Sequence, residues 1–184
     1  LYGLNVATYK IALGKTLLEL AQNNKNEIDW HLLSKVYFDN YLNRLDNISR
    51  PQQSNPARKT VMERIVKLYQ LNKINYDEAI SKVGAEAFND VIPRFQTIGT
   101  DKTITGEKFY HFIHGEKLFL HDSVFQIQED HNDELIDEIN ARWSLLEGAF
   151  TIANGDYELR NDIIDVYLLD GYERTNITKN IPFL

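Results

Sequence analysis

The spacing of the apolar residues of this chain changes at Pro93, and this change constrains the fold more than any single motif does. Before Pro93 they recur every three or four residues, the pattern of helices that bury one face. After it, two short aromatic-rich runs at 109–113 and 117–120 flank a turn that contains Gly115, which favours a β-hairpin. The sequence therefore predicts a mainly α-helical α+β fold.

A helical bundle is expected before Pro93. Its first helix covers about 6–22, and a polar run at 23–26 ends it. Asp29 is a suitable N-cap for a second helix. Asn55 followed by Pro56 predicts the N-cap and first turn of a third helix, because proline lacks an amide that would be unpaired there anyway.

Two shorter helices complete the predicted bundle. One begins at Asn75 or Asp77, and Gly84 is expected to interrupt it. The next is expected to end at Pro93, since proline removes a helical hydrogen bond.

The second half is predicted to be mixed. Asp122 can cap the segment after the hairpin, and a long amphipathic helix is expected over 132–152, with its acidic residues, Glu147 included, off the apolar face. A second β-hairpin is expected around the Asp-Gly pair at 170–171. The result is a helical subdomain at 1–95 and a mixed α/β subdomain at 96–184, interpreted as two layers of one folded unit.

Charge is unevenly distributed along the chain, whose net charge is −7. Residues 1–95 contain thirteen Lys and Arg against ten Asp and Glu, whereas residues 96–184 contain seven against seventeen. The basic excess concentrates at 44–67, where six cations face only Asp46 and Glu63. Such asymmetry is typical of a nucleic-acid contact in the first half and a solvated or partner-facing surface in the second.

Composition excludes several classes of protein. The absence of cysteine excludes a disulfide framework and a cysteine-ligated zinc site within the 184 residues. No apolar run approaches the ~20 residues of a membrane span, and no signal-peptide pattern opens the sequence, so a cytoplasmic protein without a membrane partner is expected. The apolar run Ile181-Pro182-Phe183-Leu184 after a start at Leu1 predicts a piece of a longer polypeptide.

The segment around residues 50–67 is the best binding candidate. It places amide and hydroxyl side chains before a predicted helix start that carries two cations, and free amides at that start could hold a phosphate. The alternative is a solvated loop followed by an ordinary polar helix face. The candidate nucleic-acid-binding residues are Arg50, Gln52, Gln53, Asn55, Arg58, Lys59, Arg64 and Lys67.

Three histidines form a weaker candidate for a metal site. His111, His114 and His121 fall within eleven residues, with Glu116 between them and Asp122 directly after. In a hairpin, the side chains of His111 and His114 are expected on opposite faces, whereas a working metal site needs three or four converging ligands. The alternative is three ordinary imidazoles on an exposed hairpin.

No catalytic residue is identified. The run His131-Asn132-Asp133 superficially resembles a nuclease motif, but its position at a predicted helix start favours a cap. The acidic residues of the second half lack the spacing of a metal-dependent nuclease core.

Three stretches resemble the leader region of bacterial HNH endonucleases, in which a helical part precedes a C-terminal nuclease module. They are residues 8–20 (TYKIALGKTLLEL), 141–147 (ARWSLLE) and 175–181 (TNITKNI). The chain contains neither the cysteine pairs nor the His-Asn-His constellation of that module. The resemblance implies a restriction or phage-defence context. It also implies that a divalent metal, alone or together with zinc, would belong to the missing module and not to these residues.

The sequence hypothesis is therefore a non-catalytic region of an HNH-type DNA endonuclease that positions DNA or docks a regulatory partner. The alternative is a protein-interaction or oligomerisation module, in which the acidic second half binds a basic partner or a second copy. A complete small enzyme of unfamiliar type, built around the three histidines, is a third possibility.

Overall fold

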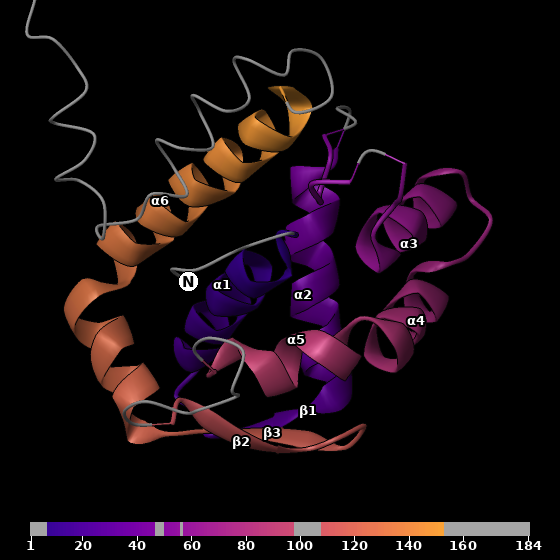
Figure 1. The fold of residues 1–184 in the computed structure, drawn as a ribbon. Coiled ribbons are helices and arrows are strands. Elements are labelled where there is room, and N and C mark those ends of the chain that lie inside the picture. Colours follow the sequence, from indigo (N-terminus) through magenta and orange to yellow (C-terminus); the bar gives the residue numbers. More distant parts are fainter. Residues whose placement is uncertain (1–6, 47–49, 56, 98–107, 153–184) are drawn as a thin grey trace, which may run out of the picture.

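The computed structural model describes residues 7–46, 50–55, 57–97 and 108–152, which form six helices and one three-stranded sheet (Figure 1). The fold class is α+β and mainly α-helical, as predicted. In chain order the elements are α1 (Tyr9–Ala21), β1 (Glu27–Asp29), α2 (Trp30–Arg44), α3 (Val61–Gln70), α4 (Tyr76–Glu86), α5 (Phe88–Phe95), β2 (Tyr110–Ile113), β3 (Lys117–Leu120) and α6 (Asp122–Ile152).

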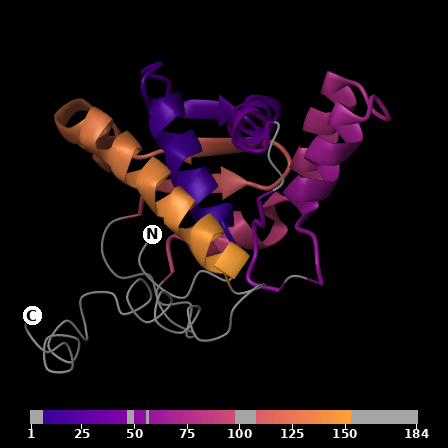
Figure 2. The ribbon, with the colours of Figure 1, turned by 90° about the horizontal axis from the view of Figure 1, so that it is seen from above.

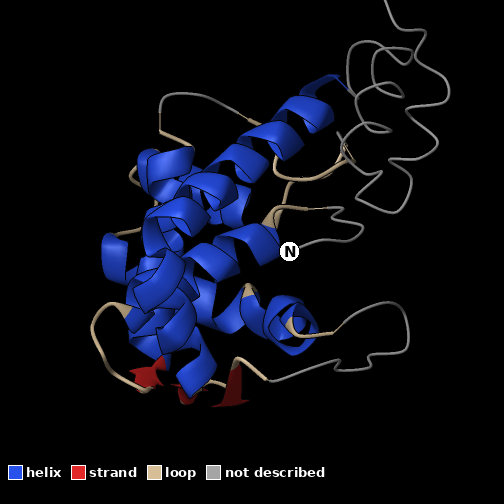
Figure 3. Cartoon of the chain, turned by 90° about the vertical axis from the view of Figure 1, so that its left-hand side faces the viewer, coloured by secondary structure: helices blue, strands red, loops and turns tan. Residues whose placement is uncertain are grey.

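The sheet lies at one end of the helices and contains the predicted hairpin (Figure 3). Strands β2 and β3 are antiparallel, with Tyr110 opposite Leu120, and Gly115 supplies the left-handed turn at φ 80°. Strand β1 pairs with the other edge of β3 and was not predicted. Its three residues are too few for a detectable alternation, so it depends on a partner distant in sequence.

Helices α1 and α2 occupy the middle of the molecule (Figures 1 and 2). Helix α6 packs along α1, whereas α4 packs on α2 and carries α3 beside it. As a result, α6 and the α3–α4 pair lie on opposite sides of the two central helices.

One hydrophobic core includes residues from both halves of the sequence. Leu13 and Phe88 belong to it, and so do Tyr110 and Trp143 from the second half. The rings of Tyr41 and Trp143 meet edge to face with centroids 5.1 Å apart. Helix α6 is therefore anchored on α2 as well as on α1.

Helix α2 begins where the sequence predicts, but by a different device. Asp29 has the extended backbone of an N-cap, yet its side chain makes no capping hydrogen bond. Instead, the Trp30 amide donates to the Glu116 carbonyl in the hairpin turn at 2.9 Å. The sheet, and not a local cap, fixes the start of this helix.

The predicted start of the third helix at Asn55 is wrong. Helix α3 begins five residues later, where Thr60 and Glu63 form a reciprocal capping box. The Val61 amide donates to the Tyr9 hydroxyl at 2.9 Å. Asn55 only closes a local turn, accepting a hydrogen bond from the Ala57 amide. The two reciprocal hydrogen bonds of a capping box stabilise a helix start more than a single Asn side chain does.

The next helix begins as predicted and continues past its predicted interruption. Asn75 and Glu78 form a second capping box at the start of α4. Gly84 lies inside the helix because the Trp30 indole packs against it and donates to its carbonyl at 2.9 Å. The glycine permits a close helix–helix contact and does not break the helix.

Pro93 does not end α5, contrary to the prediction. The helix continues to Phe95 with the proline inside it. The only backbone donor lost is that of Pro93, and the carbonyl four residues earlier belongs to Asn89, which is exposed and can be hydrated.

The long helix predicted for 132–152 corresponds to the second part of α6. An additional segment precedes it from Asp122, and the two meet at a kink where His131 has φ −140°. The kink explains why the pattern at Asn132 reads as a helix start. The second hairpin predicted around residues 170–171 lies outside the described residues.

Candidate nucleic-acid interface

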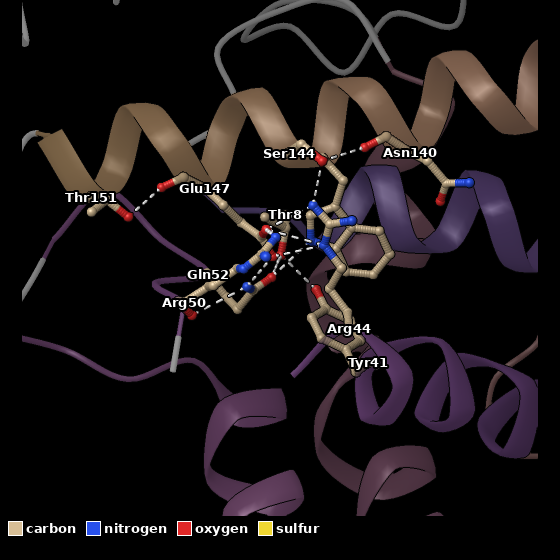
Figure 4. A network of polar contacts seen from close by, with 10 residues as sticks. Thr8, Tyr41, Arg44, Arg50, Gln52, Asn140, Ser144, Glu147 and Thr151 are labelled. Carbon is tan, nitrogen blue, oxygen red and sulfur yellow. Dashed lines mark hydrogen bonds and ion pairs between the residues drawn. The ribbon is translucent and has the colours of Figure 1, made fainter. Parts of the chain in front are cut away.

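A buried carboxylate, Glu147 of α6, lies between α6 and the end of α2 and is 2% exposed (Figure 4). The Arg44 guanidinium donates to both of its oxygens, with Nε–Oε1 at 3.0 Å and Nη2–Oε2 at 2.7 Å. Arg50 adds a bond at 3.2 Å, and the Gln52 amide donates to Oε1 at 2.7 Å. Three side chains from α2 and the following loop thus compensate one buried charge.

Gln52 extends this network to the start of the chain. Its side chain is fully buried, and its Oε1 accepts from the Thr8 hydroxyl at 2.8 Å and from the Trp143 indole at 2.9 Å. Because Thr8 uses its proton on Gln52, Tyr41 is the donor in the 2.9 Å bond between the two hydroxyls. We call Thr8, Tyr41, Arg44, Arg50, Gln52, Trp143 and Glu147 the Glu147 network.

The network joins segments from both halves of the chain. A buried ion pair stabilises a fold only if its remaining donors and acceptors are satisfied, and this one meets that condition. The Gln52 amide also reaches the Arg50 carbonyl, so all its bonding capacity is used. The network holds the 50–52 loop and α6 in one register.

Glu147 was predicted to lie off the apolar face of its helix, and this is wrong. It lies four residues after Trp143 and three before Phe150, both buried. That spacing on the apolar face was the available signal for a buried carboxylate. Its partners lie 95 or more residues away in the sequence, so periodicity could not identify them.

The eight predicted nucleic-acid-binding residues divide into three groups. Arg50 and Gln52 bind Glu147, with Gln52 fully buried and the Arg50 side chain 39% exposed. Gln53 is half-buried and forms a β-bridge with Ala7, and Asn55 is exposed in its turn. The remaining four, Arg58, Lys59, Arg64 and Lys67, are exposed, and we call them the surface cations.

The surface cations are only weakly neutralised. Lys59 lies 3.5 Å from Glu63, and Arg64 lies 3.4 Å from Glu86, with both cationic side chains more than half exposed. Within the described part of the chain, Arg58 and Lys67 have no side-chain partner. Exposed pairs of this kind contribute little and are readily exchanged for another anion.

The free helix amides expected near Arg58 and Lys59 are not available. The Glu63 amide bonds to Thr60 Oγ1 and the Thr60 amide to Glu63 Oε2. Any phosphate contact here would therefore rely on side chains, because the α3 start is already capped.

The three candidate histidines are not brought together. His111 and His121 approach to 3.1 Å between Nδ1 and Nε2, whereas the His114 ring packs on Trp30 with centroids 5.0 Å apart. Among the described residues, no group of three or more His, Asp or Glu side chains is arranged to hold a metal ion.

Three buried phenols have strongly altered acidity. Burial raises the pKa of Tyr37, Tyr41 and Tyr110 well above the ordinary value. Each makes a hydrogen bond, for example Tyr110 to the Ile92 carbonyl at 2.7 Å. At neutral pH these groups act as structural donors and not as acids or bases.

Comparison with known proteins finds no matching family model, curated protein or solved structure. Over the described residues, none of the helices combines the length and the apolar character that crossing a lipid bilayer demands. The interpretation of function therefore depends on the chain's own residues.

Proposed function

We propose that this chain is a nucleic-acid-positioning region of an HNH-type endonuclease, and that its surface cations contact phosphates. The observation that carries the proposal is how the six cations of residues 44–67 are used. Arg44 and Arg50 neutralise the buried carboxylate of Glu147, whereas the other four are exposed and lack a buried partner. Cations that no fold interaction requires are available for an external anion.

The positions of the surface cations support one contact face. Arg64 and Lys67 are three residues apart on α3 and therefore lie on the same side of the helix. Arg58 and Lys59 precede that helix directly. Helix α3 lies on the side of the molecule opposite α6, so the basic surface is separated from the acidic one (Figures 1 and 2).

The acidic surface of α6 has a complementary role in this proposal. Asp133, Glu134, Asp137 and Glu138 are exposed. They would repel a phosphate backbone, which would restrict nucleic acid to the α3 side. Strand cleavage would be supplied by a nuclease module with its own divalent metal, as the resemblance to HNH endonucleases implies.

A salt series with labelled duplex DNA tests the proposal. If all four surface cations contact phosphates, the logarithm of the binding constant should fall with the logarithm of salt concentration with a slope of about −3.6. Replacing all four by Gln should bring that slope close to zero and abolish binding at low salt.

The matched control removes the same charge elsewhere. It replaces four cations outside residues 44–67 by Gln and should retain most of the slope; these are Lys25, Lys35, Arg94 and Lys108. If both variants lost the same share of DNA affinity and salt slope, net charge alone would explain the binding. That result would reject the α3 side as the contact face. An absence of binding by the unmodified protein at low salt would reject the DNA role.

A protein-interaction module is the second candidate, favoured by the exposed acidic residues of α6 and by Leu145 on the same helix, which is 38% exposed. Light scattering after gel filtration, without DNA, distinguishes the two. A dimer that Leu145→Glu dissociates would favour this candidate, and a monomer at all concentrations would count against self-association.

A further inference from the structure

We propose that His111 and His121 form a chelating pair for a divalent transition-metal ion such as Zn²⁺, Ni²⁺ or Cu²⁺. The observation that carries the proposal is the approach of two imidazole nitrogens, His111 Nδ1 and His121 Nε2, to 3.1 Å on the accessible side of the hairpin. This site is independent of the proposed DNA contact.

The separation fits two ligands of one ion. Nitrogens about 2.0–2.1 Å from zinc lie about 3.3–3.4 Å apart at a tetrahedral angle and about 2.8–3.0 Å apart at a right angle. The observed 3.1 Å lies between these values. The separation therefore suits both the tetrahedral and the octahedral or square-planar geometries that different ions prefer, once the rings turn their lone pairs from each other toward a shared ion.

The backbone fixes the two imidazoles in place. His111 is on β2, and His121 directly follows β3, with its amide bonded to the Phe109 carbonyl at 2.9 Å. The His111 ring stacks on Phe119, with centroids 4.6 Å apart and planes within 8°. Because stacking limits ring rotation, less conformational freedom is lost when an ion binds.

The proton shared by the two imidazoles does not prevent metal binding. Without metal, one of the facing nitrogens carries a proton and donates to the other. A neutral imidazole can move that proton to its other ring nitrogen, so both facing nitrogens present lone pairs and no proton is released. The remaining coordination positions are filled by water, as at open metal sites.

The surroundings leave room for those waters. A pocket of about 660 Å³ opens beside His121 and is also lined by Asp122 and Lys108. Asp122 is exposed next to His121 and can accept hydrogen bonds from metal-bound water. Lys108 is exposed, so solvent screens its repulsion of a cation.

Calorimetric titration of tag-free protein with ZnCl₂, NiCl₂ or CuCl₂ tests the proposal. We expect one ion per chain for at least one of these metals. His111→Phe, which keeps an aromatic ring against Phe119, and His121→Asn should each weaken binding by at least about tenfold. His131→Ala, at an exposed histidine on α6, should leave it unchanged.

A second measurement does not depend on variants that fold. In the unmodified protein, substoichiometric metal should shift the imidazole resonances of His111 and His121 before those of His31, His114 and His131. No binding by any of the three metals would overturn the proposal. So would unaltered binding in both hairpin variants, an equal loss in His131→Ala, or a first effect on another histidine.

Discussion

Arg44 at the end of α2 forms a bidentate ion pair with Glu147 of α6, across 103 residues of sequence. The Arg44 guanidinium also lies over the Trp143 ring, 5.4 Å from its centroid, and donates to Ser144 at 2.8 Å. The Arg44 side chain therefore contacts α6 through an ion pair, a hydrogen bond and a cation–π contact. This arrangement requires the planar fork of arginine and could not be reproduced by lysine.

Replacing Glu147 by Ala should lower the free energy of unfolding by about 3 kcal/mol or more, because two guanidinium groups and the Gln52 amide lose their buried acceptor. Chemical denaturation would measure it. The control Glu134→Ala removes a carboxylate that is 87% exposed and should change stability by less than about 0.5 kcal/mol. Similar effects of the two substitutions would contradict the compensating role assigned to the network.

The coupling between Arg44 and Glu147 should exceed that of an exposed pair. In a double-mutant cycle with Ala substitutions, we expect a coupling energy of about 1.5–3 kcal/mol. The cycle for Arg64 and Glu86, which are 3.4 Å apart and both exposed, should give less than about 1 kcal/mol. A larger coupling in the exposed pair would also weaken the argument that Arg64 is available for phosphate.

Local sequence patterns predicted several local features of this fold. The hairpin at 110–120, the Asn75 cap and the amphipathic character of α6 all depend on residues a few positions apart. Two errors are local: the Thr60–Glu63 capping box sets the start of α3, and Pro93 lies inside α5. The other errors concern distant partners. Strand β1 exists because β3 lies beside it, and Gly84 stays helical because Trp30 packs against it.

The same distinction applies to the candidate site. Composition identified the cations at 44–67 but could not show which of them bind Glu147 and which face solvent. Arg50 and Arg58 differ only in the structure, where Glu147 lies beside Arg50. The pairing of His111 with His121, and not with His114, depends on the hairpin register, in which Phe119 lies opposite His111. Both distinctions require tertiary contacts.

The start of α3 gives a direct test of the revised helix boundary. Thr60→Ala should cost about 1 kcal/mol of stability, within a range of about 0.5–2, because it removes the acceptor for the Glu63 amide. Asn55→Ala, at the cap expected from sequence, should have a smaller effect because only the Ala57 amide is affected. The reverse order of the two effects, measured by urea denaturation, would return the helix start to Asn55.

Two helical glycines should respond oppositely to alanine. A Cβ at Gly84 would lie 2.9 Å from Ser34 Oγ and 3.2 Å from the Trp30 ring, so Gly84→Ala should destabilise the protein by about 1–3 kcal/mol. At Gly148 nothing lies within 4 Å, and Gly148→Ala should stabilise by up to about 1 kcal/mol through helix propensity. The Gly84 penalty should shrink in a Ser34→Ala background. Equal effects at both glycines would argue against the close contact of α4 with α2.

Alkaline pH should unfold the protein through its buried phenols. Burial raises the pKa of Tyr37, Tyr41 and Tyr110, so these groups ionise near pH 10 in the unfolded chain but stay protonated when folded. Their contribution to stability is complete below about pH 10 and is lost as pH rises beyond it. Phenolate absorbance and circular dichroism, followed together, should show that part of the tyrosine signal appears only with unfolding.

Tyr41→Phe should lower the stability of the protein at neutral pH, since Thr8 loses its hydrogen-bond donor, yet make that stability less sensitive to alkali. Complete ionisation of all tyrosines in protein that keeps its helical signal would show that these rings are accessible to solvent.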